Sequence, residues 1–513
     1  MKKKYIIFSI FTLVLLVALI TSFNYFKTTN TYIDDNINNQ TKIIKGISMN
    51  LEQTAGAGDY KTVTQSSWPT EGYKFNAELS RCENGSTLSW DDTKKAVIMQ
   101  GNVSDKCYVY FDIFIPKIPD VCNSGDTLAD CIKKYGDNGS AISNIYIHNS
   151  SLANGAGDNS YRYAGGDYVL TEKATNAGMK SLTSSSDTET DGITNFYCDG
   201  ERQYLYNFGC DTTSQTFYFT LQYDTSNTQY KTYNEALEKA VSDGYLTKDN
   251  VKNFVCFGSG VSPCPTENLY RTIGVFDNKV KLMKYTYNTK EQLGEDGDFS
   301  ETTTLADWGE ETTYRGNSTT LDIYYWNDST NKNTWSESLL NKINLNTNFI
   351  NNIGTTWADK IATTTWKVGG NIEMYIRNKI SSSAYKYEII NPVTTNTTDN
   401  ATEYDAKIGL MYASDYGFAA DPSAWTTKLI YYYENINETT IKSQNWMYMG
   451  YHEWIITRTP PYPTSVYFVQ SRGDVSYNTV TATIIGVRPV FNLEQSVTYV
   501  SGTGTKSDPI IIN

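Results

Sequence analysis

The strongest constraint on the fold lies near the C-terminus, in residues 446–493, where three apolar runs are separated by turn signals. The runs read W-M-Y-M-G-Y-H-E-W-I-I-T-R, V-Y-F-V-Q-S-R-G-D-V-S-Y and I-I-G-V-R-P-V-F-N-L. Apolar and polar residues roughly alternate in each run, which is the period of half-buried strands. Gly473 and Asp474 stand between two strand-like segments, where a tight hairpin needs residues that tolerate positive φ. The stretch therefore predicts half-buried strands joined through a hairpin.

Two arginines in this stretch constrain its packing further. Arg458 and Arg488 are embedded in apolar strand context, and a guanidinium there must find carboxylates or carbonyls for its five donors. We therefore expect both arginines to be structural, and Trp454 to be a core residue.

Three motifs occur in order, W-x-x-x-R at 454–458, G-x-V-x-Y at 473–477 and G-V-R-P-V-F-x-L at 486–493. This order resembles the C-terminal half of the formylglycine-generating-enzyme-like branch of the C-type-lectin fold, in particular a group of bacterial surface proteins with no assigned function. The resemblance implies an α+β fold in which residues 117–513 form a C-type-lectin-like domain. It also implies that residues 166–252 are an insertion, because the segments on either side are adjacent in that group. Surface loops tolerate such additions at low entropic cost.

The same resemblance implies where a ligand would bind. In C-type-lectin-like proteins the ligand surface lies on the final sheet and its loops, here residues 460–483. The candidate ligand-binding residues are Tyr462, Tyr467, Arg472 and Tyr477, side chains that stack on sugars or anchor protein interfaces. For Tyr467 a place in the core is the alternative, because Tyr467 and Phe468 alternate along one strand.

Catalysis is not predicted. The formylglycine-generating enzymes hold copper with two cysteines in the C-terminal half, but residues 265–513 contain no cysteine. No G-x-S-x-G elbow, H-E-x-x-H helix or phosphate-binding glycine-rich loop occurs either. The chain has only two histidines, His148 and His452, so few residues are available for a histidine-based acid–base site. A glycosidase that uses two carboxylates stays open, since the separation of carboxylates in space is invisible in a sequence.

The N-terminus predicts a membrane anchor in residues 1–27. Lys2, Lys3 and Lys4 precede 22 uncharged residues, Tyr5 to Phe26. As a helix these residues span roughly 33 Å, the thickness of a bilayer core. The lysines on the near side place the N-terminus inside and the bulk of the chain outside the cell. A cleaved signal peptide is the rival interpretation, although no good small-x-small site follows the apolar run. A prepilin is a third, but its glycine cleavage point and glutamate are missing.

The remaining organisation follows from length and composition. A chain of 513 residues should hold two or three domains. The polar residues 28–68 are predicted to be a stalk. Residues 69–116 show four short strand patterns and are predicted to form a small β module, ended by two prolines.

All eight cysteines lie between Cys82 and Cys264, an even number in a chain predicted to be extracellular. Eight cysteines allow 105 pairings, among which sequence cannot choose. Nearest-neighbour pairing gives the bridges Cys82–Cys107, Cys122–Cys131, Cys198–Cys210 and Cys256–Cys264. Zinc is the alternative, but no C-x-x-C pair occurs. We therefore expect neither a metal nor a cofactor.

The net charge of −13 argues against nucleic acid as a partner, because phosphate binding needs a concentrated basic face. The sequence thus favours a membrane-anchored extracellular protein that binds a glycan or protein ligand. The alternatives are a structural cell-envelope protein without a specific ligand and, less favoured, a glycan-active enzyme.

Overall fold

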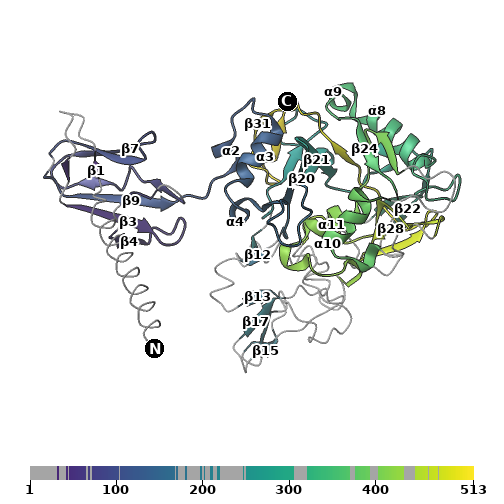
Figure 1. Ribbon diagram of the computed structural model, residues 1–513, viewed down its shortest axis with the longest axis horizontal. Helices are drawn as coiled ribbons and strands as arrows, with labels where there is room; N and C mark the ends of the chain where they lie inside the picture. The colour runs from purple at the N-terminus through teal and green to yellow at the C-terminus, as the bar shows by residue number, and fades with distance from the viewer. Residues whose placement is uncertain are drawn as a thin grey trace, which may run out of the picture. The chain divides into compact units, whose positions relative to one another are not determined.

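The computed structural model describes residues 46–64, 67–69, 72–102, 104–167, 250–304, 320–369, 376–392, 402–431, 445–459, 462–471 and 473–513, with the backbone of short strands between some of these ranges. The chain divides into two compact units, Met1–Pro116 and Lys117–Asn513 (Figure 1). We call them unit 1 and unit 2 and describe each by itself.

Unit 1 is built from a five-stranded sheet and a separate two-stranded hairpin. In the five-stranded sheet the order is β4-β3-β9-β5, and β6 also pairs with β9. The strands are β3 (Ile47–Glu52), β4 (Tyr60–Val63), β5 (Tyr73–Phe75), β6 (Arg81–Cys82), β7 (Thr87–Asp91), β8 (Ala96–Gln100) and β9 (Cys107–Ile113). Along β9 the buried positions alternate, so one of its faces packs into a core shared with Met49, Leu51 and Val97.

The predicted stalk is wrong for residues 47–63. These residues form β3 and β4, and β3 lies next to β9 in parallel, with Ile47 opposite Cys107. The buried positions in β3 include Met49 and Leu51, which alternate and supply two apolar side chains to the core. Because the residues between the two strands are polar, the short alternation of apolar residues in β3 was not recognised in the sequence.

Unit 2 is organised around a nine-stranded sheet with the order β26-β30-β21-β20-β19-β32-β31, to which β11 and β10 add beside β20. The strands are β10 (Ile145–Ile147), β11 (Tyr161–Tyr163), β19 (Phe254–Cys256), β20 (Leu269–Phe276), β21 (Lys279–Lys284), β26 (Ile408–Gly409), β30 (Val490–Asn492), β31 (Tyr499–Ser501) and β32 (Ile510–Ile512). All these pairs are antiparallel except β19 with β32.

Helices and smaller sheets pack around this sheet (Figure 1). The helical elements are α2 (Ile118–Val121), α3 (Leu128–Gly136), α4 (Ser140–Ser143), η1 (Thr266–Asn268), α7 (Lys290–Leu293), η3 (Leu340–Phe349), α8 (Ile350–Ile353), α9 (Thr355–Ala358), η4 (Ile376–Asn378), α10 (Ser381–Tyr385), η5 (Lys386–Ile390), α11 (Ala413–Ala419), η6 (Pro422–Ala424) and η7 (Leu429–Tyr431). The smaller sheets pair β22 (Phe299–Thr304) with β23 (Thr320–Tyr324) and β24 (Thr364–Lys367) with β25 (Glu403–Ala406).

The C-terminal stretch forms the three-stranded sheet β27 (Glu453–Arg458), β28 (Ser465–Val469) and β29 (Val475–Thr479). Gly473 adopts a φ of +91° in the turn between β28 and β29, the conformation for which glycine carries no steric cost. Every residue of β27 and β28 is buried. The prediction of half-buried strands is therefore wrong for these two, because unit 2 covers both of their faces.

The predicted fold class also needs correction. The protein is of mixed α/β type with many strands and 20% helix. Within the residues described above, no helix is long and apolar enough to span a membrane. The single-pass membrane location predicted from Tyr5–Phe26 is therefore not supported, and that segment itself lies outside the described residues.

Three disulfides hold local loops closed, Cys82–Cys107 in unit 1 and Cys122–Cys131 and Cys256–Cys264 in unit 2. They are three of the four predicted pairs, and the prediction of disulfides is confirmed for them. The side chains of the fourth pair, Cys198 and Cys210, are outside the described residues. The two ends of the predicted insertion meet, since the Asn250 amide donates to the Asp167 carbonyl at 3.0 Å.

Candidate functional site

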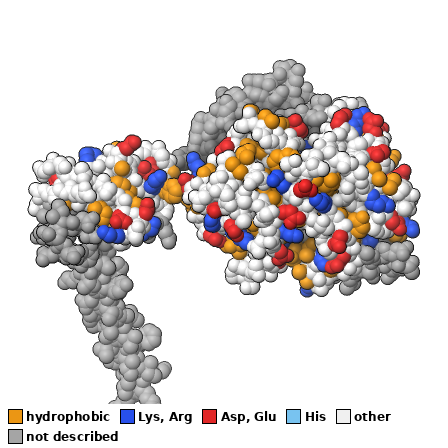
Figure 2. All heavy atoms as spheres, turned by 90° about the horizontal axis from the view of Figure 1, so that it is seen from above, with side chains coloured by type: hydrophobic (Ala, Val, Ile, Leu, Met, Phe, Trp, Pro, Cys, Tyr) orange, Lys and Arg blue, Asp and Glu red, His pale blue; other side chains and the backbone are white. Residues whose placement is uncertain are grey.

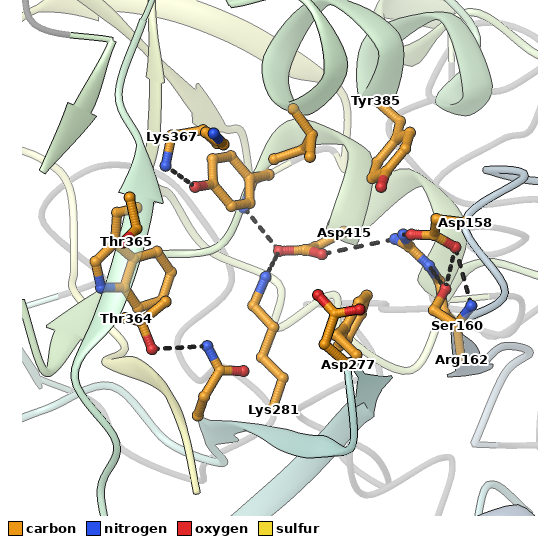
Figure 3. Close-up of a pocket in the computed structure, with 15 residues that line it drawn as sticks. Asp158, Ser160, Arg162, Asp277, Lys281, Thr364, Thr365, Lys367, Tyr385 and Asp415 are labelled. Carbon is orange, nitrogen blue, oxygen red and sulfur yellow. Dashed lines mark hydrogen bonds and ion pairs between the residues drawn. The ribbon is translucent and has the colours of Figure 1, made fainter. Parts of the chain in front are cut away.

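A cavity of about 260 Å³ opens in unit 2 beside the large sheet. Residues distant in sequence line it: they lie at 158–162, 276–281, 364–367, 385–389 and 412–415, with Asn492. Figure 3 shows two cations, Arg162 and Lys281, pointing from opposite sides toward the carboxylate of Asp415.

Arg162 enters the cavity from β11, where it stands opposite Gly274 of β20. A Cβ on Gly274 would lie 2.3 Å from the Tyr161 carbonyl oxygen, so only glycine lets β11 approach β20 this closely. The guanidinium of Arg162 is 2% exposed. It donates through Nε to Ser160 Oγ at 2.8 Å and through Nη2 to Asp158 Oδ2 at 2.6 Å. Its third nitrogen, Nη1, has no hydrogen-bond partner among the described residues and lies 3.8 Å from Asp415 Oδ1.

Lys281 rises from β21 and ends on Asp415, whose Oδ2 it contacts at 2.5 Å. Both side chains are buried. Asp415 is fixed in the first turn of α11, where its carboxylate also accepts the Tyr412 amide at 3.1 Å. Rings surround the ammonium: the centroids of Tyr412, Phe276 and Trp366 lie 4.9, 5.4 and 5.8 Å away. Such rings favour a cation electrostatically.

Burial and charge compete in setting the ionisation of these groups. Burial alone would raise the pKa of Asp158, but Arg162 and hydrogen bonds from Ser160 and Tyr385 outweigh it and lower the pKa to about 2. Burial lowers the pKa of Lys281, and the neighbouring Arg162 lowers it further, against the opposing effect of Asp415.

The wall next to Lys281 carries an unsatisfied acceptor. Asn492 stands directly across from Lys281 on the neighbouring strand β30. Its Nδ2 donates to Thr364 Oγ1 at 3.0 Å, whereas its buried Oδ1 accepts no hydrogen bond in the described part of the chain. Trp366 lies over Gly409 on the same wall, where any Cβ would come within 2.6 Å of the indole.

Two further carboxylates flank the cavity. Asp277 lies at its exposed mouth in the turn between β20 and β21, with a φ of +47°. Glu388 lies behind Asp415 and accepts the Ala413 and Ser414 amides at 3.0 and 2.9 Å and the Thr457 hydroxyl. Burial raises the pKa of Glu388 to about 7.

The predicted ligand-binding tyrosines lie elsewhere: Tyr467 and Tyr477 are on the three-stranded sheet, and Tyr462 lies between β27 and β28. Tyr467 is 0% exposed and its hydroxyl accepts the Ile376 amide at 2.8 Å, so this side chain lies in the core. Tyr477 is half-buried, with the Tyr462 ring stacked on it at 5.9 Å and the Arg377 guanidinium 5.0 Å from its ring centroid. Tyr462 alone presents an exposed ring, at 36%. Arg472 is outside the described residues.

The residues predicted to be structural are all buried. Trp454 donates through its indole to the Tyr324 carbonyl at 2.7 Å. Arg458 contacts the Asn333 carbonyl at 3.5 Å, and burial lowers its pKa to about 10. Arg488 contacts both carboxylate oxygens of Glu453, at 2.8 and 2.6 Å.

A metal centre has no basis in the described residues, where no group of three or more histidine, cysteine or acidic side chains is arranged to hold an ion. His148 is packed against Phe418 and Trp425, with ring centroids 4.7 and 5.1 Å away. Burial, helped by Arg162, lowers its pKa to about 2. A neutral imidazole held in this way is a core residue.

Sequence reasoning missed the cavity because its residues come from distant segments. One signal was available: Arg162 and Lys281 each stand in an apolar strand-like run, the criterion that singled out Arg458 and Arg488. Applied to every strand, that criterion would have selected Arg162 and Lys281 as well.

No protein family model matches this chain, and no match is found among curated proteins or among solved structures. The predicted C-type-lectin-like fold therefore gains no support from known proteins.

Proposed function

We propose that this protein is a glycan-binding protein and that unit 2 takes one sugar residue in the cavity around Lys281 and Asp415. One observation carries the proposal. A buried donor, Arg162 Nη1, and a buried acceptor, Asn492 Oδ1, line the same cavity, and neither is hydrogen-bonded within the described residues. An unsatisfied buried polar group costs about 1–3 kcal/mol, and a ligand that both donates and accepts would remove both costs. A sugar hydroxyl does both.

The walls and the size suit a sugar ring. Phe276, Trp366 and Tyr412 contribute apolar surface to the cavity, and ligand sites generally combine such walls with a few placed polar groups. The volume of about 260 Å³ lies just below the ~300 Å³ at which cavities begin to hold drug-sized ligands. A ligand smaller than a drug-sized molecule, such as one monosaccharide unit, suits a cavity of this volume.

The charges favour a neutral ligand. Asp158 and Asp415 compensate Arg162 and Lys281 within the cavity, and Lys367 at the edge pairs with Glu403. On the face that Figure 2 shows, acidic and basic side chains of unit 2 are interspersed without a broad field of one sign. Neither the cavity nor that face offers the concentrated charge that draws a polyanion or polycation.

An extracellular place supports this function. Disulfides form and persist mainly in oxidising compartments, and three of them lie within the described residues.

A glycan array probed with the full chain, followed by calorimetry on the sugars retained, tests the proposal. Asp277→Asn keeps the shape of the mouth and suits the positive φ, but it removes a charged acceptor and should weaken binding about tenfold. Tyr462→Ala removes the exposed ring of the ligand surface that the sequence predicts at residues 460–483, and it should leave the affinity unchanged. If Tyr462→Ala weakened binding and Asp277→Asn did not, the ligand would bind at the three-stranded sheet instead. A blank array would favour a structural envelope role instead.

A further inference from the structure

Lys281 has surroundings that a purely structural lysine does not need. Its side chain is 7% exposed and belongs to the cavity wall, so a small ligand in the cavity can reach the ammonium. Its contact with Asp415 places a carboxylate at 2.5 Å, close enough to exchange a proton. A reactive amine needs both features: access to a ligand and a base that takes its proton.

The neutral amine is the nucleophilic form of lysine, and two physical effects favour it here. Burial disfavours the ammonium and lowers the pKa of Lys281. The second cation, Arg162, lowers that pKa further, and a desolvated lysine beside another cationic group is a recognised way of activating this nucleophile. Asp415 while ionised, Glu388 and the surrounding aromatic rings oppose this effect, but Asp415 can accept the proton that Lys281 releases.

We propose that Lys281 captures the carbonyl carbon of an aldehyde or ketone ligand and forms an imine with it. This inference rests on the proposed role of the cavity as the glycan site. It deepens that role by naming the ligand as the reducing end of a sugar in its open-chain form. Such an end carries the aldehyde or ketone that the reaction needs.

The step balances with the groups present. Lys281 passes one proton to Asp415, and its Nζ then forms a bond to the carbonyl carbon. The carbonyl oxygen takes up the proton that the attacking nitrogen loses and becomes the hydroxyl of a neutral carbinolamine. Asp415 then returns its proton to this hydroxyl, the C–O bond breaks, and water leaves. The nitrogen lone pair forms the C=N bond of a protonated imine, so no oxidant or reductant is consumed.

A matched internal control lies on the same strand. Lys284 is buried like Lys281, and burial lowers its pKa to about 8. It stands three residues along β21, so its side chain points to the opposite face, where it donates to Thr286 Oγ1 at 3.2 Å. In the described structure it does not belong to the cavity wall. Lys284 therefore shares the burial of Lys281 but lacks access to the cavity and the neighbouring carboxylate.

The test is reductive trapping of the full chain with glyceraldehyde and cyanoborohydride near neutral pH, followed by peptide mass mapping over time. Lys281 should be labelled about tenfold faster than Lys284 and than the exposed Lys95. Asp415→Asn should slow labelling at Lys281 about a hundredfold, the lower end of what a positioned acid–base group contributes. It should leave labelling at Lys95 unchanged.

Each outcome of the trapping experiment either supports or overturns the inference about Lys281. Labelling that follows exposure alone, or an Asp415→Asn rate equal to that of the wild type, overturns the inference. The comparison of Lys281 with Lys284 needs no variant, so misfolding of Asp415→Asn does not remove the test. Retained sugar affinity without trapping would leave a non-covalent glycan site and end only the covalent step. Trapping at Lys281 with a blank glycan array would end the glycan proposal and leave the carbonyl capture.

Discussion

Arg488 is the clearest case in which one residue decides stability. The guanidinium is 2% exposed, contacts both oxygens of Glu453 and donates to the Met447 carbonyl at 2.6 Å. Removing one partner of a buried pair leaves an uncompensated charge, which costs roughly 3–5 kcal/mol. Arg488→Ala should therefore lower the free energy of unfolding of unit 2 by about 3 kcal/mol or more, measured by chemical denaturation. Arg488→Lys should recover little, because an ammonium cannot reproduce the planar two-pronged contact. An unchanged denaturation midpoint for Arg488→Ala would assign this residue another role.

The sequence predicts that Arg488 needs hydrogen-bond acceptors, but it does not identify the residue that supplies them. A guanidinium in an apolar strand requires acceptors, which the sequence shows. The carboxylate that pairs with Arg488 lies on β27, 35 residues earlier in the chain. The whole sequence contains 56 acidic residues. Only the pairing of strands in space selects Glu453 among them.

At the level of elements, Glu388 couples the start of α11 to pH. Burial raises the pKa of Glu388 to about 7, above that of an exposed glutamate near 4.3. Folding therefore binds a proton at intermediate pH, and the free energy of unfolding falls as the pH rises from about 4.5 to about 7. The full effect is on the order of 3 kcal/mol. Glu388→Gln carries no titrating proton, so thermal unfolding from pH 5 to pH 8 should show a smaller loss of unit 2 stability than in the wild type. Parallel curves for the two proteins would place the titration elsewhere.

Elements with a strong local signal were predicted well, and those defined by their surroundings were not. Thr127 caps α3 by accepting the Asp130 amide at 3.2 Å, as a threonine directly before an amphipathic run is expected to do. Two of the four strands expected within residues 69–116 form β8 and β9. By contrast, the burial of β27 and β28 on both faces depends on elements that pack over them from other parts of unit 2. Periodicity in one strand cannot report what covers its second face.

At the scale of the molecule, the cavity depends on the order of strands in the large sheet. β30 lies between β26 and β21, which sets Asn492 opposite Lys281, and β11 adds beside β20 to bring Arg162 to the same region. Segments between residues 158 and 492 are thereby joined into one site. The sequence carries no local pattern for such an arrangement, because each segment contributes only one to four residues to it.

The two units should also respond separately to perturbation, since each has its own hydrophobic core. Cys82–Cys107 joins β6 to β9 inside unit 1 and closes a loop with a sequence separation of 25 residues. A bridge of this span stabilises by roughly 3 kcal/mol in the chain-entropy model. The double change Cys82→Ser, Cys107→Ser should therefore lower the melting temperature of unit 1 by several degrees. Scanning calorimetry of the full chain should then show a second transition, that of unit 2, at its original temperature, because no core residue of unit 2 is altered. Loss of stability in both transitions together would mean that the two cores unfold as one cooperative structure.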